Sequence, residues 1–140
     1  YGYDKIKPKS VTKDSTIKKE ILNEKLKSFY KSKRIIASRG YLEAITWSFV
    51  SFEQANIGNK KANVKIKNPI SSDLDTMRSS IFPNLLNSIN TNISHLFNNG
   101  KLFEVGPQFS GPEENDQQMM ATGIMYGAFN TDNWNDEKYK

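Results

Sequence analysis

Cysteine is absent from the 140 residues, and histidine occurs only once, at His95. The absence of cysteine excludes disulfides and thiolate metal sites, and it fits a reducing compartment, so we expect a cytoplasmic protein. A single histidine excludes any metal centre or catalytic set that needs two. We therefore expect no metal site in this chain.

Long apolar runs and phosphate-binding loops are missing as well. No run approaches the roughly 20 apolar residues that cross a bilayer. No glycine-rich loop of the P-loop or dinucleotide-binding type occurs, and no nucleophile stands beside a candidate base. The sequence thus predicts neither a catalytic site nor a cofactor site of its own.

What remains is the composition of a soluble globular protein. Hydrophobic residues make up 36% of the chain and charged residues 25%, and 140 residues suffice for one domain or most of one. The first residue is Tyr1 and not methionine, so we expect a segment of a longer protein.

The net charge of +5 is unevenly distributed. Residues 1–40 hold twelve Lys and Arg against four Asp and Glu, a net charge of +8, and the remainder carries −3. A basic half can attract RNA or an acidic partner. However, only Arg34 and Arg39 in this half are arginine, the residue that nucleic-acid sites prefer for bidentate contacts. A general bias toward Lys, Asn and Ile is the simpler interpretation.

In the first half of the chain, residues 1–16 read as a tail or linker, because they contain Pro8 and lack apolar periodicity. Apolar residues three or four apart then predict a long helix that begins at Ser15 or Thr16 and ends at Gly40. Alternation over residues 41–50 predicts one strand. Residues 52–57 suggest a helical turn, and residues 64–67 a short strand that Pro69 ends.

In the second half, Ser79 or Ser80 is expected to cap a helix with Pro83 in its first turn, closing at residues 98–100. Residues 101–105 and 119–129 are expected to be strands, separated by a polar loop over 110–118. This order favours an α+β fold, with an antiparallel sheet flanked by helices. Parallel crossover connections would contradict that expectation.

Arg78 and Glu104 are the polar residues singled out. Arg78 follows a turn and precedes a helix, and it serves either as a structural ion-pair partner or as a clamp for a phosphate or carboxylate. Without a glycine-rich loop nearby, we favour the structural role. Glu104 lies in an apolar strand, where an unpaired buried charge costs several kcal/mol. We therefore hypothesise that Arg78 pairs with Glu104.

Several segments resemble the β subunit of bacterial phenylalanyl-tRNA synthetase in the order in which that family shows them. They read YGYD at 1–4, GYLEAITWSF at 40–49, NPIS at 68–71, MR at 77–78, FPNLL at 82–86 and LFEVG at 102–106. Gly127 and Trp134 then stand where the family has a glycine and a tryptophan. The resemblance covers essentially the whole chain.

The resemblance implies a position in that family's catalytic-like core module, the B6/B7 region. Residues 1–16 would be the tail of a preceding B5-type domain, and residues 17–140 part of a class II aminoacyl-tRNA synthetase-like core whose sheet continues past the last residue. The helix ending at Gly40 and the strand after it resemble class II motif 1, which serves subunit association. Residues 102–106 and 119–129 resemble motif 2, with Glu104 near the place where an active site presents an arginine to ATP.

The implied function is therefore non-catalytic. The module would support ATP-dependent attachment of phenylalanine to tRNA(Phe) by the α subunit within an α₂β₂ heterotetramer, with ATP and Mg²⁺ serving the whole enzyme. Alternatives are an RNA-binding module that uses the basic N-terminal helix, and, with less support, an active ligase domain. The structural or interface candidates are Arg78, Glu104, Glu43, Asn68, Pro69, Trp47 and Phe49.

Overall fold

The computed structural model describes residues 2–10, 21–57 and 64–128. Its helices are α1 (Glu24–Ala37), α2 (Phe52–Ala55) and α3 (Phe82–Ser94), and short 3₁₀ turns occur at Tyr3–Lys5, Ser72–Leu74 and Glu114–Asp116. Its strands are β1 (Leu42–Glu43), β2 (Phe49–Val50), β3 (Thr76–Met77), β4 (Gly100–Phe109) and β5 (Gln117–Tyr126). Among these described residues, no helix has the length and apolar character needed to span a membrane.

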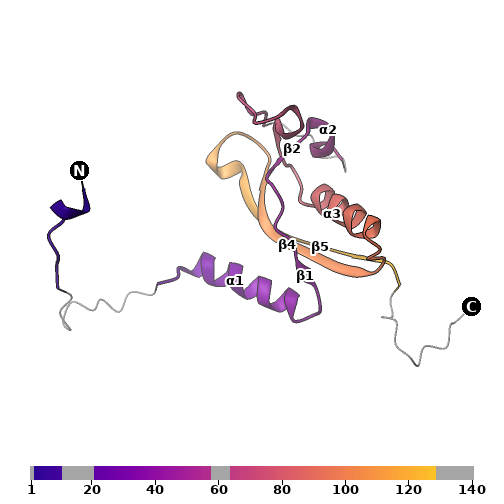
Figure 1. The fold of residues 1–140 in the computed structure, drawn as a ribbon, viewed down its shortest axis with the longest axis horizontal. Coiled ribbons are helices and arrows are strands. Elements are labelled where there is room, and N and C mark those ends of the chain that lie inside the picture. The colour runs from indigo at the N-terminus through magenta and orange to yellow at the C-terminus, as the bar shows by residue number, and fades with distance from the viewer. Residues whose placement is uncertain (1, 11–20, 58–63, 129–140) are drawn as a thin grey trace, which may run out of the picture.

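A long hairpin of β4 and β5 forms the central element of the fold (Figure 1). The two strands pair antiparallel from Gly100 opposite Tyr126 to Phe109 opposite Gln117. β4 is longer than the strand predicted at 101–105, and β5 begins and ends earlier than the strand predicted at 119–129. The 3₁₀ turn Glu114–Asp116 lies in the loop that was predicted to be irregular.

The predicted α+β class is confirmed, but the expectation of a wholly antiparallel sheet is wrong. β1 lies beside β4 in a parallel arrangement, with Leu42 opposite Leu102, so the sheet of order β1-β4-β5 is mixed. The parallel pairing is two residues long, whereas the hairpin pairs over ten. A crossover is possible because α3 lies between β1 and β4 in the chain.

The single strand predicted over residues 41–50 is in fact divided between two sheets. Near its start, Ala44 N–H donates a hydrogen bond to Phe103 C=O of β4. Near its end, Ser48 C=O accepts a hydrogen bond from Arg78 N–H. β2 then pairs antiparallel with β3. The change of partner breaks the strand, because one extended segment cannot follow two sheets that diverge. The strand predicted at 64–67 is reduced to a bridge between Lys65 and Thr76.

The apolar core lies between α3 and the hairpin. Ile81, Leu85 and Ile89, spaced four apart and hence on one face of the helix, pack with Leu102 of β4. Ala44, Ile124 and Tyr126 are partly buried against this cluster. Burial of each large apolar side chain stabilises the fold by roughly 1.5–3 kcal/mol, so packing and not helix propensity holds α3 on the sheet.

Both ends of α3 differ from the prediction. The N-cap is Ile81, without a side-chain cap, while Ser79 Oγ donates to Ala55 C=O at 2.6 Å. The helix stops at Ser94, well before residues 98–100, because Leu96 takes a left-handed conformation with φ 69°. Leu96 and Phe97, which lie within the predicted helix, follow its observed end and are exposed.

Helix α1 begins later than predicted. Its N-cap is Asn23, whose side chain accepts from Leu26 N–H, and Ile21 and Leu22 lie before it. The predicted start at Ser15 or Thr16 falls outside the described residues. At the other end Gly40 has φ 81°, as expected for a residue that terminates a helix.

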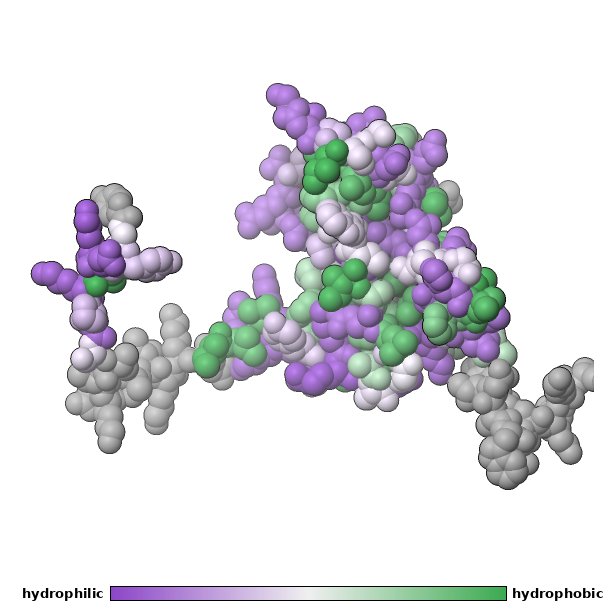
Figure 2. All heavy atoms as spheres, in the orientation of Figure 1, coloured by the Kyte–Doolittle hydropathy of each residue, from purple (hydrophilic) through white to green (hydrophobic). Residues whose placement is uncertain are grey.

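Helix α1 packs only loosely on the rest of the protein. None of its residues is buried, and Figure 2 shows hydrophobic surface near its first turn. Figure 1 shows α1 and α3 on opposite sides of the hairpin, with α1 farther from the main body. Its apolar side chains are therefore largely without a partner among the described residues.

Candidate functional site

Arg78 and Glu104 meet in the interior of the protein. Arg78 Nη1 lies 2.7 Å from Glu104 Oε1, and the two side chains are only 1% and 5% exposed. The hypothesised pairing is therefore present in the structure. A charge-assisted pair at this distance is strong, and its burial removes the competition and screening that water would provide.

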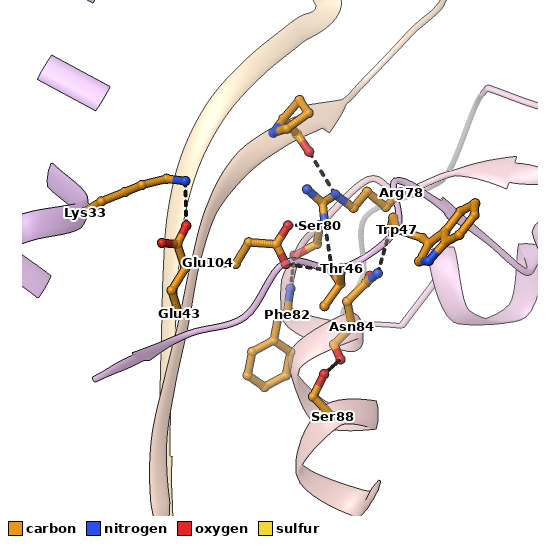
Figure 3. A network of polar contacts seen from close by, with 11 residues as sticks. Lys33, Glu43, Thr46, Trp47, Arg78, Ser80, Phe82, Asn84, Ser88 and Glu104 are labelled. Carbon is orange, nitrogen blue, oxygen red and sulfur yellow. Dashed lines mark hydrogen bonds and ion pairs between the residues drawn. The ribbon is translucent and has the colours of Figure 1, made fainter. Parts of the chain in front are cut away.

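Two further groups complete the arginine's surroundings (Figure 3). Arg78 Nε donates to Pro107 C=O at 2.9 Å, and Nη1 also donates to Thr46 Oγ1 at 2.9 Å. Thr46 in turn donates to Glu104 Oε2 at 2.6 Å. Both carboxylate oxygens are thus hydrogen-bonded, and the closed Arg78–Glu104–Thr46–Pro107 network compensates the desolvation of both charges.

Three separate parts of the chain bring these side chains together. Arg78 directly follows β3, and its backbone is fixed by Ser48 C=O and Phe109 N–H. Glu104 is in the middle of β4, and Thr46 lies between β1 and β2. The network therefore ties the two sheets to each other through side chains as well as through the backbone.

Gly106 provides the space that the guanidinium occupies. A Cβ atom at this position would lie 2.6 Å from Arg78 Nη2 and 3.1 Å from Glu104 Oε1. Alternation along β4 places Leu102, Glu104 and Gly106 on one face of the strand. The glycine of the LFEVG motif is thus required by the arginine packed over it.

The charges of the network are balanced within the chain. The positive charge of Arg78 is paired with the carboxylate of Glu104, and its Nε and Nη1 donate to acceptors of the same chain. To bind a phosphate, Arg78 would have to break these contacts and leave Glu104 buried without a partner. Breaking a buried pair in this way costs several kcal/mol, so the geometry favours the structural alternative over the clamp.

The other predicted residues lie outside the network. Glu43 forms an ion pair with Lys33, and this contact attaches β1 to α1. Lys33 Nζ also lies 4.4 Å from the ring centre of Phe29. Asn68 and Pro69 are exposed in a turn and touch none of the network residues in the contacts observed. The structure does not bring these two positions to the site.

Trp47 and Phe49 line a groove on the outer side of the segment over residues 45–50. The groove has a volume of about 350 Å³ and runs between residues 45–50 and α3. Its side toward the strand carries Ile45, Trp47 and Phe49. Figure 3 shows the Trp47 ring turned away from Glu104, so Thr46 faces the network and Trp47 the groove.

Asn84 and Thr46 are site residues that sequence reasoning missed. Asn84 Nδ2 donates to Trp47 C=O at 2.8 Å, which fastens α3 to the segment beside the groove. Thr46 could have been identified, because alternation with Ala44 and Ser48 places it on the inner face. Asn84 had no such signal, since nothing in the FPNLL motif shows which chain segment it meets.

No group of three or more His, Cys, Asp or Glu side chains that could hold a metal ion occurs within residues 2–10, 21–57 and 64–128. His95 caps the C-terminal end of α3 and is exposed.

Comparison with known proteins identifies a family. Residues 8–140 match the family described as the phenylalanyl tRNA synthetase beta chain CLM domain. The chain is 38% identical over 136 residues to the phenylalanine–tRNA ligase beta subunit of Paramagnetospirillum magneticum. The aligned region covers 96% of this chain and 17% of the relative.

Two further relatives carry the same name. The protein of Rhodospirillum rubrum is 36% identical over 96% of this chain and 17% of its own length, and that of Bradyrhizobium diazoefficiens is 34% identical over 91% and 16%. The chain thus spans about one sixth of the length of these relatives. On this similarity, the chain belongs to the family of the phenylalanyl-tRNA synthetase β-chain CLM domain.

Proposed function

We propose that this chain is a non-catalytic structural module of a phenylalanine–tRNA ligase β subunit. It would support ATP-dependent charging of tRNA(Phe) by the α subunit, and hence protein biosynthesis in the cytoplasm. The observation that carries the proposal is the engagement of Arg78, the buried arginine of the candidate site, by Glu104, Thr46 and Pro107.

The electrostatics of the network argue against nucleotide binding. A unit charge about 4 Å from a phosphate is worth roughly 4 kcal/mol at an effective dielectric of 20. A cation already neutralised by Glu104 contributes little of this attraction, and a free carboxylate at the same position would repel the phosphate. The module accordingly leaves ATP and Mg²⁺ to other parts of the whole enzyme.

We further infer that the fold is a partial class II synthetase-like core, corresponding to the B6/B7 region. The β4–β5 hairpin with Glu104 at its centre supports a resemblance to motif 2, and α1 followed by β1 supports a resemblance to motif 1. Because β1 pairs with β4 in parallel, only the β4–β5 hairpin corresponds to the antiparallel sheet of such a core. Residues 1–16 would then connect to a B5-type domain.

Unpartnered apolar surface supports a role in assembly. Ile45 is 86% and Trp47 63% exposed, and α1 has no buried residue. Contiguous exposed apolar and aromatic groups mark surfaces that bind other proteins. The α subunit, in an α₂β₂ heterotetramer, is the partner that the family points to.

The RNA-binding alternative has less support. Two lysines of the basic helix are engaged with carboxylates, Lys27 with Glu24 and Lys33 with Glu43. The relatives are named as ligase subunits and not as separate RNA-binding proteins. We therefore assign contact with tRNA(Phe) to the whole enzyme.

The test is co-expression of the complete β polypeptide with its α subunit, followed by measurement of complex size and charging activity. We expect an α₂β₂ particle that charges tRNA(Phe), and no ATP–pyrophosphate exchange by the β polypeptide alone. Exchange activity of β alone, at a rate comparable with the complex, would contradict the proposal. So would tRNA binding by β alone that falls steeply with added salt.

A further inference from the structure

Helix α3 ends in a turn that ordinarily uses glycine. Leu96 N–H donates to Ile93 C=O and Phe97 N–H donates to Asn92 C=O, each at 2.9 Å, which is the bonding pattern of a Schellman motif. This motif needs a left-handed residue just after the helix, and Leu96 takes that position with φ 69°. Leucine is disfavoured there, because its Cβ atom crowds the following carbonyl oxygen. Within the described residues, every other positive φ belongs to a glycine.

The strained leucine also presents its side chain to solvent. Leu96 is 84% exposed, and Phe97 and Ile93 are 65% and 45% exposed. Figure 2 shows hydrophobic surface on the side of the molecule where α3 ends. The residue at the position of Phe97 commonly packs on the last turn of its own helix, but its counterpart here is Asn92, whose amide donates to Tyr126 Oη. Neither backbone preference nor packing among the described residues accounts for the leucine.

The lack of charge restricts what can cover the α3 terminal patch, which consists of Ile93, Leu96 and Phe97. From residue 82 to residue 100 the sequence contains no Asp, Glu, Lys or Arg, and His95 is its only histidine. Charged groups steer separate molecules together and select among them. A patch with so little charge suits apolar contact with a segment that is already held nearby.

The chain itself returns to the neighbourhood of this patch. Ala128 N–H donates to Asn99 Oδ1 at 2.6 Å, so the backbone that follows β5 is bonded to the loop that follows α3. Gly127 permits this approach, because it has φ 82° and a Cβ atom there would collide with Asn98 C=O. The relatives are about six times as long as this chain. A segment tethered close to the patch has a high effective concentration there.

We propose that the part of the β polypeptide that follows residue 140 packs an apolar segment on the α3 terminal patch. The inference rests on the proposed function, which makes this chain one part of a longer β subunit. Leu96 is the anchor of the contact, because burial of its side chain offsets the strain of its backbone. The contact lies within one polypeptide, so the patch is covered before the α subunit binds.

The first test measures the accessibility of residue 96 in the complete β polypeptide. Leu96→Cys is compared with Ile70→Cys, because the two native side chains are 84% and 81% exposed and residues 1–140 contain no other cysteine. Each variant is labelled with N-ethylmaleimide in native buffer and in urea, and the labelled peptide is identified by mass spectrometry. We expect labelling of residue 96 to be at least about tenfold slower in native buffer than in urea. Residue 70 should show little difference.

The same rates distinguish the other candidates for the patch, the α subunit and a second copy of β. Slow labelling of residue 96 in free β, unchanged by added α subunit and by protein concentration, supports the proposal. Labelling that is fast in free β, that slows only when α is added, or that slows as the concentration of β rises overturns it. If β and α form no complex, the proposed function fails, while the rates in free β still decide the inference.

The second test uses Leu96→Gly, for which strain and burial predict opposite signs. Glycine is the preferred residue at this position, so on an uncovered helix end it would slow amide hydrogen exchange in the last turn of α3. Under a covering segment, the loss of the buried leucine side chain outweighs the relief of strain. We expect exchange of the last turn in the complete β polypeptide to accelerate about tenfold. Equal or slower exchange in the glycine variant overturns the proposal.

Discussion

Arg78 is a charged residue that is only 1% exposed. Its charge is tolerated because three acceptors surround it: the Glu104 carboxylate and the Pro107 carbonyl, both of β4, and the Thr46 hydroxyl. Each acceptor also gains from the contact, since Glu104 would otherwise be a buried anion. Loss of any member therefore affects the others.

Replacing Arg78 by alanine should destabilise the protein by about 3–5 kcal/mol, because Glu104 then remains buried without a cation. Glu104→Gln should act in the same direction with a smaller effect. Urea unfolding monitored by circular dichroism would measure both. Lys27→Met, at an exposed pair with Glu24, is the control and should change stability by less than about 1 kcal/mol. Equal stability of Arg78→Ala and wild type would refute the structural role of the network.

Gly106→Ala tests the fit around the guanidinium. The new methyl group would meet Arg78 Nη2 at 2.6 Å, and we expect a loss of roughly 1–3 kcal/mol from overpacking. Gly123→Ala, on the neighbouring strand with its nearest side-chain atom at 3.4 Å, should change the unfolding midpoint little. A Gly106→Ala variant as stable as Gly123→Ala would show that the arginine can move aside at no cost.

At the scale of the element, α1 depends on its ends more than on its packing. It has no buried residue, and its attachments include the Lys33–Glu43 ion pair and the Asn23 cap. Exposed helices with few tertiary contacts gain a larger share of their stability from caps. The helix should therefore respond clearly to changes at residue 23.

Asn23→Ala should fray the first turn of α1 at a cost of about 1 kcal/mol, because Leu26 N–H loses its acceptor. Asn23→Asp keeps an acceptor at the same position and should be close to wild type. Amide hydrogen exchange of the first turn would report the difference. Identical exchange rates in the alanine and aspartate variants would mean that the cap does not hold this end of the helix.

The segment over residues 41–50 shows how one element can serve two sheets and two surfaces. Its inner side carries Ala44 into the core and Thr46 into the network, and its outer side exposes Ile45 and Trp47. The alternation was visible beforehand and predicted two faces. Which face would be buried was not predicted, because the large apolar side chains of Ile45 and Trp47 are exposed.

For the whole molecule, a structural role and a catalytic role of the network predict different outcomes in the assembled enzyme. The double variant Arg78→Met with Glu104→Leu replaces a buried ion pair by apolar groups of similar size. Such exchanges are often neutral or stabilising, whereas removal of one partner is not. We expect the α₂β₂ enzyme with this double variant to charge tRNA(Phe) with a kcat within about twofold of wild type.

The measurement is aminoacylation of tRNA(Phe) at a temperature at which the variant complex is intact by size-exclusion chromatography. The single variant Arg78→Met should lower the amount of complex while leaving kcat per assembled enzyme unchanged. A hundredfold loss of kcat in an intact double-variant complex would assign the network a part in the chemistry and contradict the structural role.

Local chemistry made several features predictable from the residues alone. A carboxylate in an apolar strand needs a cation, and Arg78 was the suitable one, so the pair with Glu104 could be anticipated. A glycine at the end of a helical stripe predicted the positive φ of Gly40. The ordered motifs from residue 40 to residue 106 pointed to the family that the comparison found. Each of these depends on a residue's own chemistry or on neighbours close in sequence.

Other features were decided only by the tertiary structure. Thr46 and Glu104 are 58 positions apart, and β1 lies parallel to β4 because α3 crosses between them. The division of residues 41–50 and the unpaired oxygen of Asn84 likewise depend on which distant segments come together. Periodicity determines on which face of an element a side chain lies. The segment that packs against that face is selected by the competition among all possible packings of the chain.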